Sequence, residues 1–251
     1  MPPSAADSTP APIRDITFAM KPIWAKLTFW RRLSGYHPAI RGAALATAFR
    51  SGGVFSRHAG DAAAPAGSSH REGMATTAHP FWAETFESER LIVREMLEIG
   101  AFEGRTTAFA AKLFPNARIT CVDPWAEYCE MRDLSRAERA FGRNTAAFGE
   151  RIRALKGFSA ELLPQLLREG EKFDVIFVDG SHAYDDVVVD TQHAWALLNP
   201  GGVLIWDDYL WRRPGYGRNV PKRAIDEFLS DHRGAFTPLW AFKQVAIRKS
   251  A

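Results

Sequence analysis

Short apolar runs alternate with amphipathic stretches along most of the chain beyond residue 82. The runs predict buried strands over Met96–Ile99, Arg118–Val122, Ile152–Leu155, Phe173–Val178 and Gly202–Trp206. The stretches between them predict helices over Thr106–Leu113, Leu134–Phe148, Ala160–Leu167 and Tyr184–Leu198. Pro164 does not fit this pattern, because a proline inside a helix removes a backbone donor. Strands that alternate with helices indicate a parallel sheet covered on both faces.

The last part of the chain closes the sheet in a different way. A helix is expected near Lys222–Leu229, and the apolar runs Phe236–Trp240 and Gln244–Arg248 follow it. Two strands so close in the sequence indicate an antiparallel hairpin, and Pro238 suits an edge strand because proline lacks the backbone N–H. The sequence therefore predicts an α/β fold, with a doubly wound, mostly parallel sheet and a C-terminal antiparallel hairpin.

Residues 1–80 differ from the rest in composition and are expected to form an N-terminal extension to a domain of residues 81–251. Residues 1–11 and 51–79 are rich in Ala, Gly, Ser, Pro and Thr, so they bury little surface and are expected to be flexible. Apolar residues between Ile16 and Trp30 recur at three- and four-residue steps and predict an amphipathic helix over 13–33. This helix is expected to pack on the domain, on a partner subunit of a homo-oligomer or on a membrane surface. The alternative is that translation begins at Met74, in which case the helix is not part of the protein.

Charge and cysteine content narrow the classes of function. Residues 1–80 contain nine Lys and Arg and four Asp and Glu, which leaves 23 basic and 25 acidic side chains in the domain. Such a near-neutral domain argues against a groove for nucleic acid. No apolar run approaches the about 18 residues that span a bilayer, so stable membrane insertion is not expected. Cys121 and Cys129 are the two cysteines; they provide no disulfide framework, and a cytoplasmic location is expected.

The first candidate site follows the first predicted strand. Glu98-Ile99-Gly100-Ala101-Phe102-Glu103-Gly104 indicates a tight turn into a helix whose first N–H groups face a ligand. The Gly-x-Gly-x-x-Gly turn of nucleotide-dependent dehydrogenases is missing. Asp123 ends the second strand, where a carboxylate can accept hydrogen bonds from the hydroxyls of a ribose. The alternatives are a turn that binds no ligand and an Asp123 that caps a helix.

A second group of candidates follows the later strands. Ser159 and Ala160 open a helix, where Ser159 acts as an N-cap, meets an adenine edge, or does both. Asp179, Asp207 and Asp208 come after adjacent strands, and their carboxylates would repel one another unless a cation lay between them. Oxygen ligands of this kind favour Mg²⁺. The alternative is that these are solvated loop carboxylates with a capping role.

His182 comes three residues after Asp179 and is placed to act as a general base, since a histidine has a near-neutral pKa. The alternative is an ordinary surface histidine. Several aromatic residues near the same loops either form a wall for a ring-shaped acceptor or pack in the core: Trp125, Tyr184, Trp206, Tyr209 and Trp211.

Taken together, these residues resemble a class I S-adenosylmethionine-dependent methyltransferase of the small bacterial O-methyltransferase group. The motifs that carry the resemblance are Leu97–Gly104, Asp123, Asp179-Gly180-Ser181-His182 and Asp207-Asp208-Tyr209. A Gly-x-Ser at Gly157-Phe158-Ser159, followed by Leu162-Leu163-Pro164-Gln165-Leu166, is similar to the catechol O-methyltransferase branch. The resemblance covers residues 90–250 and implies a Rossmann-like fold.

The resemblance also implies a role for each matching position. The methionine end of the cofactor would be shaped by Glu98, Gly100, Phe102, Gly104 and Thr106. Asp123 would hold the ribose, Ser159 and Ala160 the adenine edge, and Asp179 would face the cofactor amine. Mg²⁺ would be held by Asp179, Asp207 and Asp208. The chain departs from that branch in two places: Asp208 stands where an Asn is usual, and His182 replaces the catalytic Lys.

The activity implied by the resemblance is metal-assisted O-methylation of a small-molecule hydroxyl. The methyl group would move in line from the sulfonium to the oxygen, while Mg²⁺ lowers the pKa of the hydroxyl and His182, with Asp179 beside it, takes part in catalysis. Two alternatives stay open at this point. One is a non-catalytic binding or scaffold protein on the same fold, and the other is a metal-dependent enzyme of another reaction type.

Overall fold

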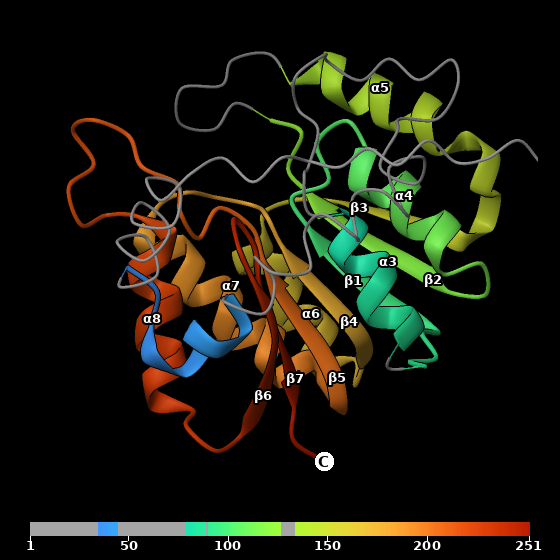
Figure 1. Cartoon of the computed structure of the whole chain (residues 1–251). Coiled ribbons are helices and arrows are strands. Elements are labelled where there is room, and N and C mark those ends of the chain that lie inside the picture. The colour runs from blue at the N-terminus through green and yellow to red at the C-terminus, as the bar shows by residue number, and fades with distance from the viewer. Residues whose placement is uncertain (1–34, 45–78, 89, 127–133) are drawn as a thin grey trace, which may run out of the picture. The chain divides into compact units, whose positions relative to one another are not determined.

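The computed structural model describes residues 35–44, 79–88, 90–126 and 134–251 (Figure 1). The helix expected over 13–33 lies outside these ranges, and the division of the chain at residue 80 stays a prediction. Residues Tyr36–Ala251 cluster into one unit by their contacts. None of the helices in the described ranges has both the length and the apolar character needed to cross a membrane.

A seven-stranded sheet forms the centre of this unit, in the order β3-β2-β1-β4-β5-β7-β6. The strands are β1 (Glu95–Ile99), β2 (Arg118–Asp123), β3 (Ile152–Lys156), β4 (Phe173–Val178), β5 (Leu198–Trp206), β6 (Phe236–Ala241) and β7 (Val245–Lys249). Strands β1 to β5 pair in parallel, and β7 lies antiparallel between β5 and β6. The predicted fold class is therefore confirmed. The strand order reverses between β1 and β4, which is where open sheets of this kind bind ligands.

Helices cover both faces of the sheet (Figure 1). On one face lie α3 (His79–Ser88), α4 (Arg105–Leu113) and α5 (Ser135–Thr145), and on the other α6 (Ser159–Arg168), α7 (Tyr184–Leu197) and α8 (Pro221–Asp231). The helix predicted over Leu134–Phe148 is shorter than expected: α5 ends at Thr145, and a 3₁₀ segment, η2 (Ala146–Arg151), follows with Gly149 at φ 54°. Helix α6 contains Pro164 and begins at Ser159.

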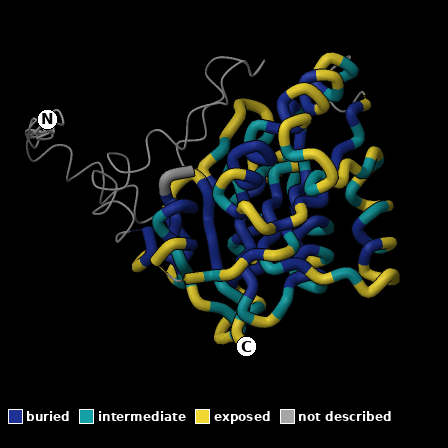
Figure 2. Tube along the Cα trace, turned by 90° about the vertical axis from the view of Figure 1, so that its right-hand side faces the viewer, coloured by how far each residue is buried: buried dark blue, intermediate teal, exposed yellow. Residues whose placement is uncertain are grey.

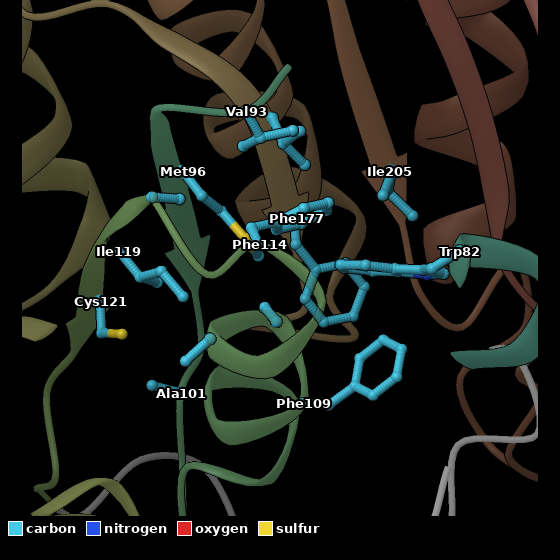
Figure 3. Close-up of a cluster of buried hydrophobic side chains, with 14 of the residues drawn as sticks. Trp82, Val93, Met96, Ala101, Phe109, Phe114, Ile119, Cys121, Phe177 and Ile205 are labelled. Carbon is cyan, nitrogen blue, oxygen red and sulfur yellow. The ribbon is translucent and has the colours of Figure 1, made fainter. Parts of the chain in front are cut away.

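Helix α3 was not expected from the sequence, and its aromatic residues explain why it forms. Trp82 is fully buried, with its ring centroid 5.1 Å from that of Phe177 on β4 and 6.2 Å from that of Phe109 on α4. Aromatic side chains are mediocre helix formers, so this helix depends on tertiary packing rather than on local propensity. Figure 3 shows Trp82, Phe109 and Phe177 together with other side chains of the same cluster, such as Met96 and Phe114. Buried residues run along the strands, and exposed residues are concentrated on outer helix faces and loops (Figure 2).

A short segment that precedes α3 by many residues also packs on the domain. It contains the 3₁₀ turn η1 (Pro38–Ile40), with the Ile40 side chain fully buried. Tyr36 stacks on Tyr209 at 5.5 Å and donates a hydrogen bond to the carbonyl of Phe242. The backbone N–H of His37 donates to the Tyr209 hydroxyl at 2.9 Å. This segment thus anchors the residue that comes directly after Asp207 and Asp208.

Candidate functional site

The glycine turn after β1 lies against the loop that follows β4. The N–H of Gly100 donates to the Val122 carbonyl at 2.8 Å, and the N–H of Asp179 donates to the Ile99 carbonyl at 2.8 Å. A Cβ atom on Gly100 would stand 2.2 Å from the carbonyl oxygen of Asp179. Only glycine fits this place, which also has a φ of +88°. The structure therefore brings the predicted Gly100 and Asp179 together at the point where the strand order reverses.

The same turn leads into α4 with its first N–H groups uncapped by a side chain. Gly104 is the N-cap residue at φ 77°, and no side-chain hydrogen bond caps the helix. Phe102 has a φ of 45°, which is a strained conformation for a residue with a side chain. Thr106 is buried in the first helical turn. A helix start of this kind favours a negatively charged ligand group.

Asp123 holds the glycine turn in place. One carboxylate oxygen accepts the N–H of Phe102 at 2.8 Å, and the other accepts the N–H of Trp125 at 2.7 Å. The indole N–H of Trp125 donates back to the Phe102 carbonyl at 2.8 Å. Burial raises the pKa of Asp123, and the backbone N–H groups oppose that shift. A carboxylate has lone pairs for further donors, so this arrangement is compatible with the ribose role that the sequence predicts.

Glu98 lies behind the turn, between β1 and α4, and is 1% exposed. Its Oε2 accepts a hydrogen bond from the Thr107 hydroxyl and lies 3.7 Å from the Cys121 sulfur. Burial raises the pKa of Glu98 to about 8, with nearby Asp123 contributing in the same direction. The carboxyl group is thus mostly protonated at neutral pH. Its contacts here are with protein groups, so it supports α4 beneath the site.

Replacing Glu98 by glutamine is expected to stabilise the protein at alkaline pH. Between pH 4.5, the ordinary pKa, and about 8, the folded state keeps a proton that the unfolded state has released. Stability of the wild type therefore falls as pH rises through this window. The glutamine amide does not ionise. The free energy of unfolding of Glu98→Gln should therefore equal that of the wild type below pH 4.5 and be about 2–4 kcal/mol higher above pH 8.

Urea unfolding at several pH values measures this difference. Glu95→Gln on the same strand is the control, since the Glu95 side chain pairs with Arg118 at the surface. The control should change stability by about 0–1 kcal/mol. A Glu98→Gln difference that does not vary with pH would contradict a protonated Glu98.

Ser159 and Ala160 begin α6 as residues of its first turn, and no side chain caps this helix. The Ser159 hydroxyl hydrogen-bonds to Asp190 on α7, which the sequence did not single out. Asp190 is 2% exposed, and burial raises its pKa to about 6. Its Oδ2 also lies beside Gly180, since a Cβ there would be 3.3 Å away. Asp190 thus links the start of α6 to the loop after β4, while Ala160 is exposed.

Three carboxylates follow β4 and β5, as the sequence predicts. Burial raises the pKa of Asp179, and Asp207 and Asp208 raise it further by repulsion. Burial and Asp208 raise the pKa of Asp207 to about 6, while the Gln244 side chain lowers it. Gln244 was not expected at the site from the sequence; its side chain is 1% exposed and accepts the indole N–H of Trp82 at 2.7 Å. Burial and repulsion between neighbouring carboxylates therefore favour the protonated forms of Asp179 and Asp207.

The metal site predicted at these three carboxylates stays a prediction. Among the described residues, no group of three or more His, Cys, Asp or Glu side chains is arranged to hold a metal ion. Asp208 approaches His182. Its φ is 56°, and its Oδ2 lies 2.7 Å from Nε2 of His182. One of the three proposed ligands is therefore paired with the proposed base.

His182 is held from two sides. Asp208 contacts its Nε2, and the indole of Trp211 stacks on the imidazole at 4.6 Å with an interplanar angle of 20°. The N–H of Trp211 donates to the Asp208 carbonyl at 2.8 Å, so the three residues form one unit. About half of the His182 side chain (49%) stays exposed. A histidine oriented by a carboxylate and open to solvent is suited to proton transfer.

The aromatic residues separate into two groups. Trp125, Trp206 and Tyr209 are buried and make structural hydrogen bonds, such as that of the Trp206 N–H to Thr191 at 2.8 Å. Trp211 is half-buried beside His182, and Tyr216 meets it edge-on at 5.2 Å. Trp211 is therefore the residue of the predicted aromatic wall that lies beside His182, and Tyr216 packs against Trp211.

Comparison with known proteins agrees with this geometry. Residues 97–209 match a family described as a methyltransferase domain. This part of the chain is therefore similar to a methyltransferase domain. This match agrees with the family predicted from the motifs, and the matched residues contain the glycine turn, Asp123, Asp179, His182 and Asp208.

The individual relatives of this chain are distant in sequence. Uncharacterized protein R132 of Acanthamoeba polyphaga mimivirus is 27% identical over 132 residues, which cover 51% of this chain and 55% of that protein. The chain thus spans about half the length of the curated relative it matches.

Solved structures show the same fold. The O-methyltransferase TomG from Streptomyces achromogenes, solved with S-adenosylmethionine, has a TM-score of 0.55 at 19% identity over 80% of this chain and 89% of its own. MycE of the mycinamycin biosynthetic pathway, solved with Mg and S-adenosylhomocysteine, has a TM-score of 0.54 at 17% identity over 80% of this chain and 54% of its own.

Proposed function

We propose that this chain methylates a hydroxyl of a small molecule with S-adenosylmethionine as the methyl donor. The observation that carries the proposal is the contact between His182 and Asp208, whose side chains lie 2.7 Å apart. The two residues follow β4 and β5, and the glycine turn follows the neighbouring parallel strand β1. A scaffold protein has no need for a half-exposed histidine that is oriented by a carboxylate. The methyltransferase domain match and the S-adenosylmethionine-bound relative TomG support the choice of donor.

Residues of the candidate site would each bind a different part of the methyl donor. The turn at Gly100 and the uncapped start of α4 would receive the carboxylate of the methionine moiety, because helix starts favour negative charge. Asp123 would accept the ribose hydroxyls. Asp179 and Asp207 would face the positively charged end of the donor, which favours their ionised forms. S-adenosylmethionine supplies, when bound, a methyl group on a positively charged sulfur.

His182 would take the proton of the acceptor hydroxyl at a defined atom. Because Nε2 lies against Asp208, that nitrogen carries the hydrogen and donates it to the carboxylate. Nδ1 of the neutral ring then holds the lone pair that can accept a proton. Asp208 orients the ring and stabilises the charge that His182 gains, as a carboxylate partner does in other acid–base pairs. The proposal assigns no step to a metal ion, since Asp208 is engaged in this way.

Titration calorimetry with S-adenosylmethionine tests the donor site. Asp123→Ala is expected to weaken binding at least about tenfold, because it removes both the ribose acceptor and the support of Phe102. Asp174→Ala is the matched control. Asp174 also accepts two backbone N–H groups, those of Arg94 and Glu95 at 2.9 and 3.1 Å. It lies at the amino end of β4, whereas the candidate site lies at the carboxyl ends of the strands.

Both variants should lose similar stability, and Asp123→Ala alone should lose affinity. No binding of S-adenosylmethionine by the folded wild type would overturn the proposed function. Transfer assays run with added Mg²⁺ and with a chelator address the metal, because MycE was solved with Mg. A strict Mg²⁺ requirement would favour Asp179, Asp207 and Asp208 as metal ligands over the pairing of His182 with Asp208.

A further inference from the structure

After Asp207 and Asp208, the loop from β5 to α8 and the first turn of α8 carry only positive charge. From Tyr209 to Ile225 the sequence contains five basic residues and no acidic one. Lys222 and Arg223, on α8, pair with Asp226 and Glu227 one turn further on. The other three are the loop arginines, Arg212, Arg213 and Arg218, and all three are exposed. This loop is the orange one at the upper left of Figure 1.

Ring contacts fix the loop to the candidate site. Trp211 stacks on His182 at 4.6 Å, and Tyr216 meets Trp211 edge-on at 5.2 Å. The guanidinium of Arg213 lies over the Tyr216 ring at 5.6 Å. A continuous series of contacts thus leads from the proposed base to an arginine.

The far end of the loop is held as well. The side-chain oxygen of Asn219 accepts the N–H of Tyr184, at the start of α7, at 2.7 Å. The N–H of Asn219 donates to the Tyr216 carbonyl at 2.8 Å. The loop arginines are therefore displayed from a segment that is anchored at both ends.

Negative and positive side chains lie at opposite ends of this series of contacts. The inner end, near His182, holds Asp179, Asp207 and Asp208, which disfavour a further negative group. The outer end holds the loop arginines, whose planar guanidinium groups suit phosphate and carboxylate oxygens. Residues 81–251 carry 23 basic and 25 acidic side chains, so the positive charge is local and matches a small anion better than a polyanion.

We propose that the acceptor carries a phosphate or carboxylate group at a distance from its reacting hydroxyl, and that Arg212, Arg213 and Arg218 bind this group. The hydroxyl meets His182, the body of the acceptor lies along Trp211 and Tyr216, and the anionic group reaches the arginines. Specificity then comes from both ends, because an acceptor with the anion near its hydroxyl is repelled by the inner carboxylates. This inference rests on the proposed methyl transfer for the identity of the ligand as an acceptor.

Anion binding to the full chain loaded with S-adenosylhomocysteine tests the arginines without turnover. The probes for calorimetry are inorganic pyrophosphate and, separately, benzoate. The triple variant Arg212→Gln, Arg213→Gln, Arg218→Gln is expected to weaken binding of at least one probe about tenfold or more. Tighter binding of pyrophosphate would indicate that the acceptor carries a phosphate group, and tighter binding of benzoate would indicate a carboxylate group.

The control is a second triple variant, Arg94→Gln, Arg118→Gln, Arg168→Gln, which removes the same charge from exposed positions outside the loop. It should bind both probes within about twofold of the wild type, since distant surface charges are screened. Equal binding by both triple variants, or no binding of either probe by the wild type, would overturn the inference.

Turnover separates this inference from the proposed function. Matched acceptors, such as 3,4-dihydroxybenzoate and its methyl ester, share the hydroxyls and differ in the charge of the far group. Methyl transfer that prefers the charged member, and loses this preference in the loop variant, supports the inference. Transfer that ignores the charge overturns it and leaves the proposed function intact, whereas absent S-adenosylmethionine binding with loop-dependent anion binding overturns the proposed function alone.

Discussion

Replacing Gly100 by alanine is expected to abolish S-adenosylmethionine binding and to lower the free energy of unfolding by about 3–5 kcal/mol. The added Cβ would lie 2.2 Å from the Asp179 carbonyl oxygen and 2.6 Å from the Gly180 Cα. Both neighbours are backbone atoms, so the contact cannot be relieved by a change of rotamer. The φ of +88° adds strain for any residue with a side chain. Chemical denaturation and titration calorimetry measure the two effects.

Gly142→Ala is the matched control, because a Cβ at this position of α5 meets no atom within 4 Å. It should leave binding unchanged and raise stability by up to about 1 kcal/mol, as alanine favours a helix over glycine. Should Gly100→Ala fail to fold, Gly104→Ala provides a milder test. Its Cβ would approach side-chain atoms of Phe141 and Thr145 at 2.9 and 3.0 Å, and such atoms can give way. Wild-type binding by both glycine variants would contradict the proposed cofactor turn.

The positions of the candidate residues could be predicted from the sequence because parallel strands end at one edge. Once β1, β2, β4 and β5 are recognised from their apolar runs, the residues after them have to lie near one another. Gly100 and Asp179 illustrate this, since they are far apart in the chain and in contact in the fold. The glycine requirement at Gly100 follows from the same crowding.

Pairings between loop side chains could not be predicted, because they depend on backbone directions that no periodicity encodes. The contact between Asp208 and His182, which Asp208 makes from a backbone with positive φ, was not expected. Ser159 was expected to cap its helix or meet adenine, and it contacts Asp190 from a neighbouring helix. Helix α3 was missed for a related reason: its stability comes from Trp82 meeting Phe109 and Phe177, which are distant in sequence.

Replacing His182 by glutamine is expected to lower kcat for methyl transfer by about 10²–10⁴-fold, the usual contribution of a general base. Binding of S-adenosylmethionine should change by less than about twofold, since the side chain is 49% exposed and lies on the acceptor side in the proposed arrangement. Asp208→Asn should lower kcat by about 10²-fold, because the amide cannot stabilise the charge that His182 gains. Initial rates with saturating donor, and calorimetry for donor affinity, measure these changes.

His193→Gln is the matched control for His182. This histidine lies on α7, where its Nδ1 contacts the Val189 carbonyl at 2.8 Å. Its replacement should leave kcat within about twofold of the wild type. If His182 only packed against Trp211, then glutamine would cost stability and affinity without a selective loss of kcat. A His182→Gln enzyme with near wild-type kcat would remove the proton-transfer role and return the three carboxylates, with a metal, as the means of activating the hydroxyl.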